Sequence, residues 1–210
     1  MGAEIGSAPS EFQEVTMILF NNTKIPDELL KPLLKAAARA VGARLGKVPV
    51  KLTQGRYSHT QGHFHNCLWV KRWALTGVRK WDRNEKLRPA WKKDDRKVYC
   101  DGGYIRLAMP AHNGSCSEDE IGPMVRFCFE IMMHEFAHVA DAQEYKVFRS
   151  SYPFPGAQRR KKWGRRHIEV SAIDRVDAAI DRGAIERNID ALIDLATWYH
   201  ERARKDQSGK

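Results

Sequence analysis

Apolar residues follow two different rhythms along this chain, and each rhythm predicts a different kind of element. Short apolar runs bounded by turn residues predict strands at about 15–20, 48–52, 61–70, 98–99 and 104–109. Apolar residues that recur every three or four positions predict helices at about 26–45, 118–145 and 167–181. After an interruption at Arg182-Gly183, a last helix is predicted to run to about Ala203. This order indicates an α+β fold, in which a small mixed sheet packs on the 118–145 helix and C-terminal helices follow.

Residues at the ends of the two longest helices predict their boundaries. Gly46 follows the last periodic position of the 26–45 helix, so we expect that helix to end there. Ser117 precedes the 118–145 helix as a predicted N-cap, and Glu120 completes a capping box with it. The second helix therefore has a defined start as well as a periodic apolar face.

The chain is predicted to form one domain. Its 210 residues are enough for a single hydrophobic core. We expect residues 15–204 to form that domain, residues 1–14 and 205–210 to be tails, and a basic insertion to occupy about 71–97. The apolar runs are far shorter than the roughly 20 residues that a membrane helix needs, so no membrane partner is expected.

The strongest chemical pattern is His134-Glu135-Phe136-Ala137-His138, which lies within the predicted 118–145 helix. Residues four apart on a helix project from the same face, so His134 and His138 can bind one zinc ion together. Glu135 then lies beside the metal and can take a proton from a zinc-bound water. We expect one catalytic Zn²⁺, with Glu135 as the general base.

A zinc site of this kind needs a third protein ligand. The pattern H-E-x-x-H-x-x-G-x-x-H would supply it within the same segment, but here Asp141 stands at the Gly position, and Asp does not end a helix as Gly would. His167 and Glu169 remain as candidates. We favour Glu169, because an acid on the predicted apolar stripe is costly to bury unless it is paired or bound to metal. That stripe also contains Ala172, Ile173, Val176 and Ile180.

The alternative for Glu169 is an ion pair with Arg165 or Arg166, which lie just before the predicted helix. His167 would then be the third ligand. Four residues are candidates for the donor that stabilises a developing oxyanion, and the sequence does not choose among them: Tyr145, Tyr152, Arg166 and His167.

His134 to His138 followed by Glu169 and Ala172 resembles the gluzincins, and the short chain resembles the minimal zinc metallopeptidases found in phage and bacterial genomes. The resemblance covers roughly residues 98–181. It implies a metalloendopeptidase that acts on a protein or peptide. It also implies an edge strand that binds the substrate by β-augmentation, for which we expect Tyr104, Ile105, Arg106, Leu107 and Ala108 within the segment 104–110.

The chain departs from the thermolysin type at one position. Those gluzincins carry an Asp four residues after the third ligand, where it orients a zinc-bound His, but here that position is Ile173. Asp141 lies three residues after His138, on the predicted ligand face. We therefore expect Asp141 to accept a hydrogen bond from a ligand His.

Positive charge adds a second class of partner. The chain carries a net charge of +10, with a calculated pI of about 9.6. Between Trp69 and Lys97 there are eleven Lys or Arg residues against four acids, interleaved with Trp, and a second basic cluster spans 159–166. Basic residues among aromatic ones can hold a phosphate backbone and stack bases, although a solvated basic surface is the plainer interpretation.

Two further hypotheses follow from that charge. The first is a DNA-associated protease of the Spartan type, whose three His ligands would favour His167 over Glu169. The second is a nucleic-acid-binding protein that keeps a zincin scaffold without catalysis. Salt-dependent nucleic-acid binding without zinc-dependent cleavage would favour the second.

Cysteine and histidine positions bear on compartment and on a second metal. No C-x-x-C pair is present and the N-terminal segment lacks the pattern of a secretory signal, so we expect a cytoplasmic protein, or one in the host cytoplasm if a phage encodes it. His63, His65 and Cys67 alternate and would share one face of a strand. With Cys100 they could hold a structural zinc; the alternative is a polar strand face.

Overall fold

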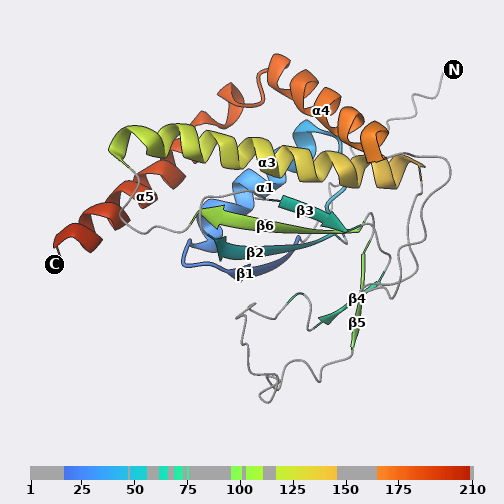
Figure 1. Cartoon of the computed structure of the whole chain (residues 1–210), viewed down its shortest axis with the longest axis horizontal. Helices are drawn as coiled ribbons and strands as arrows, with labels where there is room; N and C mark the ends of the chain where they lie inside the picture. The colour runs from blue at the N-terminus through green and yellow to red at the C-terminus, as the bar shows by residue number, and fades with distance from the viewer. Residues whose placement is uncertain are drawn as a thin grey trace, which may run out of the picture.

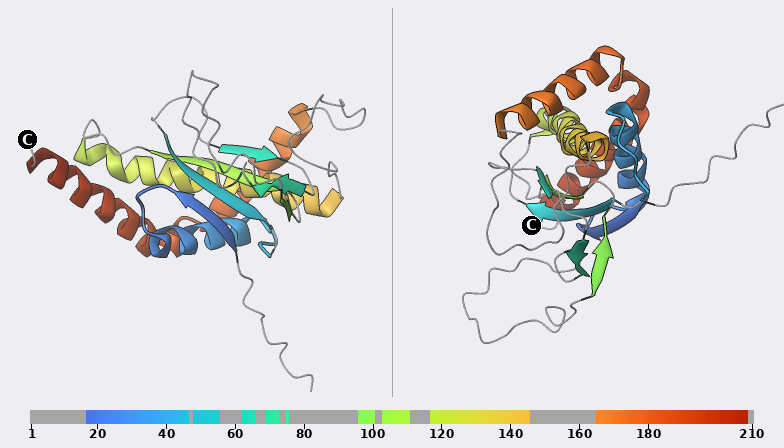
Figure 2. Two further views of the ribbon diagram at one scale, coloured as in Figure 1. Left: turned by 90° about the horizontal axis from the view of Figure 1, so that it is seen from below. Right: turned by 90° about the vertical axis from the view of Figure 1, so that its right-hand side faces the viewer.

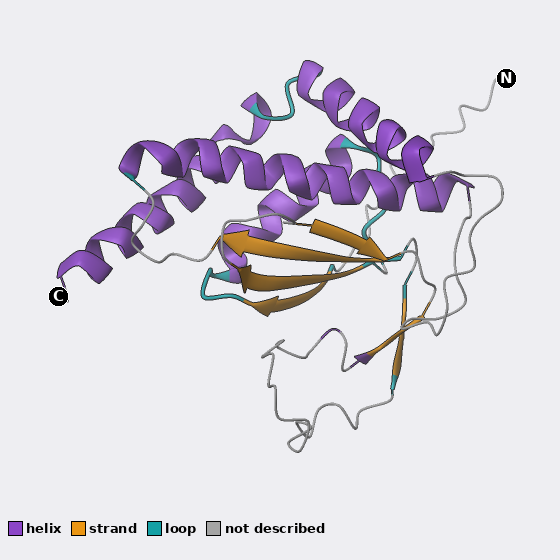
Figure 3. Cartoon of the chain, in the orientation of Figure 1, coloured by secondary structure: helices purple, strands orange, loops and turns teal. Residues whose placement is uncertain are grey.

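The computed structural model describes residues 17–46, 48–55, 62–65, 69–72, 75, 96–100, 103–110, 117–145 and 165–208. At 69–71, 118, 145, 165–168 and 206–207 it describes the backbone alone. A small mixed sheet, the helices that cover it and two C-terminal helices make up this part of the chain (Figure 3). The predicted α+β class is therefore confirmed.

Four strands form the main sheet in the order β1-β2-β6-β3. The parallel strands are β1 (Ile18–Asn22), β2 (Pro49–Gly55) and β6 (Tyr104–Pro110), and β3 (Gly62–His65) pairs with β6 in the antiparallel sense. The register places Leu19, Val50 and Ile105 side by side. Successive residues of a strand point to opposite faces, so this row and the row through Leu52 and Leu107 face the helices.

The helices lie on one face of this sheet in two layers (Figures 1 and 2). Helices α1 (Asp27–Ala40) and α3 (Glu118–Tyr145) lie next to the strands, and α4 (Arg165–Asp181) crosses α3 on the side away from the sheet. A short 3-10 helix η2 (Glu186–Asn188) leads into α5 (Ile189–Ser208), which packs against α1 and α3. The motif helix α3 is thus covered by strands below and by α4 above.

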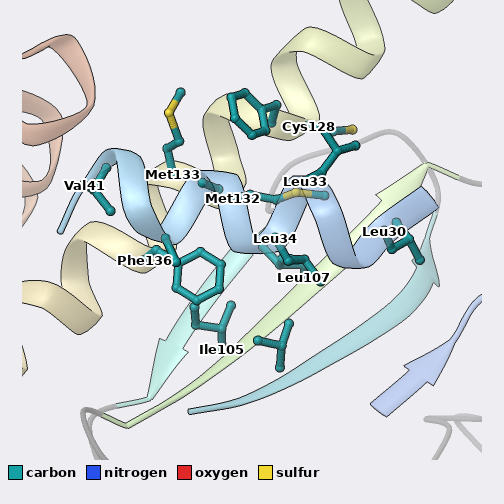
Figure 4. Packing of buried hydrophobic residues seen from close by; sticks show 14 of the residues in the cluster. Leu30, Leu33, Leu34, Val41, Ile105, Leu107, Cys128, Met132, Met133 and Phe136 are labelled. Carbon is teal, nitrogen blue, oxygen red and sulfur yellow. The ribbon is translucent and has the colours of Figure 1, made fainter. Parts of the chain in front are cut away.

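The core forms where α1 and α3 meet the sheet (Figure 4). Leu30, Leu33 and Leu34 of α1 are fully buried, as are Ile105 of β6 and Phe136 of α3. Each such side chain contributes about 1.5–3 kcal/mol when it leaves water. Phe136 lies inside the H-E-x-x-H motif, so this side chain anchors the motif to the core.

The capping predictions had different outcomes at the two helices. At the start of α3, Glu120 accepts a hydrogen bond from the backbone N–H of Ser117 at 2.9 Å, as a capping box requires. The prediction that α1 ends at Gly46 is wrong: α1 ends at Ala40, and Gly42 has a φ of 80°. The N–H of Ala43 bonds to the carbonyl of Ala38, which completes a Schellman motif around Gly42.

Several predicted boundaries are shifted. The first strand is displaced toward the C-terminus, and the single strand predicted at 61–70 is two separate strands, β3 and β4 (Trp69–Lys71). The last helix continues to Ser208, past the predicted end at Ala203 and into the predicted tail. Tyr199 anchors α5 to the main sheet. Its buried hydroxyl donates a hydrogen bond to the carbonyl of Pro110 at the end of β6, at 3.1 Å.

The prediction of β6 as the edge strand is wrong. Tyr104, Ile105, Arg106 and Leu107 pair with β3 on one side, and Ile105 to Pro110 pair with β2 on the other, so Ala108 also lies in an interior strand. An interior strand has no edge to offer a peptide. Among the described strands the outermost one beside β6 is β3, and it contacts α3.

A second, smaller unit lies on the other face of the sheet. Strands β4 and β5 (Lys97–Tyr99) pair in the antiparallel sense, and the N–H of Arg72 bonds to the carbonyl of Arg96 at 2.7 Å. Leu75, Cys100 and Tyr104 form a buried cluster beside them, with Phe20 and Val98 packed against it. Within the described residues, no helix combines the length and the apolar character that a bilayer span requires.

Candidate metal centre

Three donor atoms from α3 and α4 converge on one point. The Nε2 atoms of His134 and His138 are 3.2 Å apart, and Oε2 of Glu169 lies 3.3 Å from the first and 3.6 Å from the second. Two atoms that each lie about 2.0–2.1 Å from a tetrahedral zinc ion are about 3.3–3.4 Å apart. The triangle formed by these donors therefore has the dimensions that three ligands of one metal ion require.

The fold brings these side chains together in a simple way. His134 and His138 are one turn apart on α3, so their rings leave the helix from the same face. Ala172 of α4 is fully buried where the two helices cross, and its small side chain allows the close approach that brings Glu169 over the His pair.

The stripe argument for Glu169 is wrong in detail. The face of α4 that packs inward is formed by Ala172, Val176 and Ala179, whereas Ile173 is 49% exposed. The Glu169 side chain is itself 51% exposed, so burial of an acid does not explain its position. A carboxylate that is exposed to solvent yet directed at two imidazoles is suited to act as a metal ligand at the solvent-facing entrance of a site.

Glu135 is the buried acid of the site. It is only 6% exposed, and its Oε2 has no hydrogen-bond partner among the described residues. Burial, and secondly the negative charge of Glu169, raise the pKa of Glu135 to about 8. A cation between the three donors would oppose both causes, because an opposite charge nearby favours the ionised carboxylate.

His138 is held in the state that a metal ligand needs. Burial, and secondly the charge of His134, lower the pKa of His138, which favours the neutral imidazole. Phe64 of β3 stacks on this ring, with 5.6 Å between the ring centroids and 22° between the planes. A neutral imidazole packed against an aromatic side chain leaves Nε2 available to bind a cation.

Asp141 has a different partner from the one predicted. Its Oδ1 accepts a hydrogen bond from Nε of Arg175 at 2.6 Å, and Arg175 also bonds to Glu144. Within the described residues, Nδ1 of His138 and Oδ2 of Asp141 are both buried without a hydrogen-bond partner, and no hydrogen bond joins Asp141 to either ligand His. Arg175 was not singled out in the sequence, because nothing local to it identifies a partner on α3.

The other candidates fall outside what the structure describes. Tyr152 lies outside the described residues, and only the backbone is described for Tyr145, Arg166 and His167. The oxyanion donor therefore stays a prediction, as does the role of the basic segments.

Of the proposed second metal site, the structure describes His63, His65 and Cys100. The two His rings share one face of β3, with centroids 6.3 Å apart, and His65 stacks on Tyr104. Cys67 lies outside the described residues, and Cys100 bonds to the carbonyl of Val98. Within the described part of the chain, the one group of three or more His, Cys, Asp or Glu residues with converging donors is His134, His138 and Glu169, which could hold a metal ion.

Known proteins offer no guide to this site. Comparisons of the chain with protein families, with curated proteins and with solved structures found no match. The chemistry has to be argued from the residues themselves.

Proposed function

We propose that this chain is a zinc-dependent metalloendopeptidase, with a site formed by His134, His138 and Glu169. The observation that carries the proposal is the convergence of three donor atoms, 3.2–3.6 Å apart, beside the buried carboxylate of Glu135. A hydrolytic zinc site combines three protein ligands, one open position and a general base.

The donor set favours zinc over other divalent cations. Two neutral imidazole nitrogens and one carboxylate oxygen suit Zn²⁺, whereas Mg²⁺ and Ca²⁺ prefer sites made of oxygen alone. Three protein donors leave a fourth tetrahedral position for water or substrate. The exposure of Glu169 supports access to that position from solvent.

The residues of this site would divide the work of peptide hydrolysis. Zinc, when bound, supplies a Lewis acid that polarises the scissile carbonyl and lowers the pKa of water toward about 7. Glu135 accepts a proton from the attacking water and delivers it to the nitrogen of the leaving amine. Burial under β3 shields this carboxylate from bulk solvent.

The same proposal places the substrate along β3. This strand passes over the site, with Phe64 on His138 and Gly62 against Glu135. An extended peptide beside β3 would bring one of its carbonyl groups to the three donors. Main-chain recognition of this kind depends little on sequence, which suits a protease that acts on unfolded segments.

The substitution Glu135→Gln tests the proposal. The variant should keep one zinc ion per chain and its fold, while cleavage of casein falls by about 10²–10⁴-fold, the contribution typical of a general base. Glu130→Gln is the matched control, because Glu130 lies on the same helix and pairs with the exposed Arg126. Cleavage by Glu135→Gln at the rate of the parent would refute the proposed role of this residue.

A further inference from the structure

Strand β3 turns two residues toward the motif helix, and one of them is a glycine. Residues two apart on a strand share a face, so Gly62 points the same way as Phe64, which stacks on His138. A Cβ atom added at Gly62 would lie 2.4 Å from Oε1 of Glu135, 2.6 Å from its Cγ and 2.7 Å from its Cδ. Each of these distances is shorter than non-bonded atoms can adopt.

The backbone gives no other reason for glycine at this position. Gly42 and Gly183 have positive φ angles and so need glycine for their conformation, but Gly62 has no such angle. A glycine inside a strand weakens it, because the unfolded chain gains freedom and no side chain packs. What the missing side chain provides at residue 62 is space, and Glu135 occupies that space.

We propose that Gly62 is the positioning residue for Glu135: its missing side chain leaves a slot between β3 and α3 that holds this carboxylate in place. The carboxylate is then confined by the strand on one side and by its own helix on the other. The catalytic role of this carboxylate rests on the proposed function. The steric relationship between residues 62 and 135 is independent of metal and of activity.

The first experiment tests the steric relationship in metal-free protein. Gly62→Ala should lower the melting temperature by about 4 °C or more in the parent chain. In a Glu135→Ala background, which lacks the Cγ, Cδ and Oε1 atoms, the same substitution should cost little or raise the melting temperature, because alanine suits a strand better than glycine. An equal loss in both backgrounds would overturn the proposal, since the obstruction would then lie elsewhere.

Gly122→Ala is the matched control for this substitution. Gly122 lies in α3, and a Cβ atom there meets nothing within 4 Å. Pro123 follows Gly122 and disfavours a helical residue with a Cβ atom before it, so some loss of melting temperature is expected. That loss should be equal in the two backgrounds, because the added Cβ atom does not approach Glu135. The substitution should leave zinc content and cleavage at the values of the parent.

The second experiment tests the consequence for catalysis in the zinc-loaded protein. Gly62→Ala should keep one zinc ion per chain and a KM close to that of the parent, while kcat falls by about 10²-fold, as a displacement of about 1 Å can cause. A crystal structure of the variant should show the Glu135 carboxylate displaced while His134 and His138 stay in place. An unchanged kcat, or an undisplaced carboxylate, would overturn the proposal.

The two experiments also separate this inference from the proposed function. If the parent cleaves no peptide but the substitutions at 62 and 135 remain coupled in stability, the proposed function fails and the slot at Gly62 stands. If the parent cleaves peptides but the coupling is absent, the proposed function stands and the inference fails.

Discussion

Arg175 of α4 donates a hydrogen bond to Asp141 of α3, with 2.6 Å between Nε and Oδ1, at a place where the Asp141 side chain is only 4% exposed. The same guanidinium bonds to Glu144 one turn further along α3. This fork ties the helix that carries Glu169 to the helix that carries the two His ligands. The arrangement of the candidate metal centre is thus supported by an ion pair that contains none of its three donor residues.

Replacing Arg175 by Met should destabilise the protein strongly. The change leaves the buried Asp141 carboxylate without its partner, and an uncompensated buried charge costs about 3–5 kcal/mol of unfolding free energy. Urea unfolding of the metal-free protein measures this loss. Arg126→Met, which breaks the exposed pair with Glu130, should cost less than about 1 kcal/mol and serves as the control. Equal losses for the two variants would show that the Arg175 pair is no stronger than a surface pair.

Replacing Glu169 by Ala should weaken zinc binding by more than about 100-fold, since losses of that size already follow when an outer hydrogen-bond partner of a ligand is removed. Competition with a chromophoric chelator measures the affinity. Asp174→Ala removes an exposed acid from the same helix and should leave the affinity unchanged. If His167→Ala weakens binding and Glu169→Ala does not, the third ligand is His167 and the gluzincin-like arrangement is wrong.

Stability should fall at alkaline pH because of Cys128. Burial raises the pKa of this thiol from 9.0 to about 12. As pH rises, the unfolded chain therefore loses this proton before the folded chain does. The stability that the buried, neutral thiol contributes is complete below about pH 9 and is lost as pH rises toward 12, at up to about 1.4 kcal/mol per pH unit. Unfolding free energies of the parent and of Cys128→Ala should converge by about 2 kcal/mol between pH 9 and about 10.5. Parallel pH profiles would contradict the assignment.

Nucleic acid or another polyanion should bind the basic segments in a salt-dependent manner. If about six phosphates are contacted, the affinity for DNA should fall by about 10³-fold between 50 and 200 mM salt. Replacing Arg159, Arg160, Lys161 and Lys162 by Ala should flatten that dependence without changing zinc content. Gel-shift titration measures both. No binding at low salt would leave these segments as a solubilising surface and would favour a general peptidase.

The sequence predicted the features that depend on local chemistry. Helix α3 begins and ends where the pattern placed it, at Glu118 and Tyr145, because its periodic apolar face and the Ser117 capping box both lie within or beside the helix. The His pair follows from helical spacing alone. Glu169 was favoured as the third ligand because two His residues alone do not complete a zinc site. The apolar stripe used to support that choice was misplaced on α4.

What the sequence did not reveal depends on partners far along the chain. The interior place of β6 is set by its pairing with both β2 and β3, and no local pattern in residues 104–110 records that order. Gly62 and Arg175 acquire their roles from Glu135 and Asp141, which lie on another element. A glycine within the predicted 61–70 strand, directly before His63, was the available signal, since a strand glycine often marks a close approach.

The paired strands β4 and β5 have a consequence for engineering. Arg72 and Arg96 stand at the ends of these two strands and are joined by a backbone hydrogen bond. Loop-closure entropy changes slowly with length, so lengthening or shortening the segment 76–95 should cost little from loop closure alone, provided that Leu75 is kept for its small core. Because this stem lies on the opposite side of the sheet from α3, a peptide inserted between its two strands would start on the face away from the candidate metal centre (Figure 1).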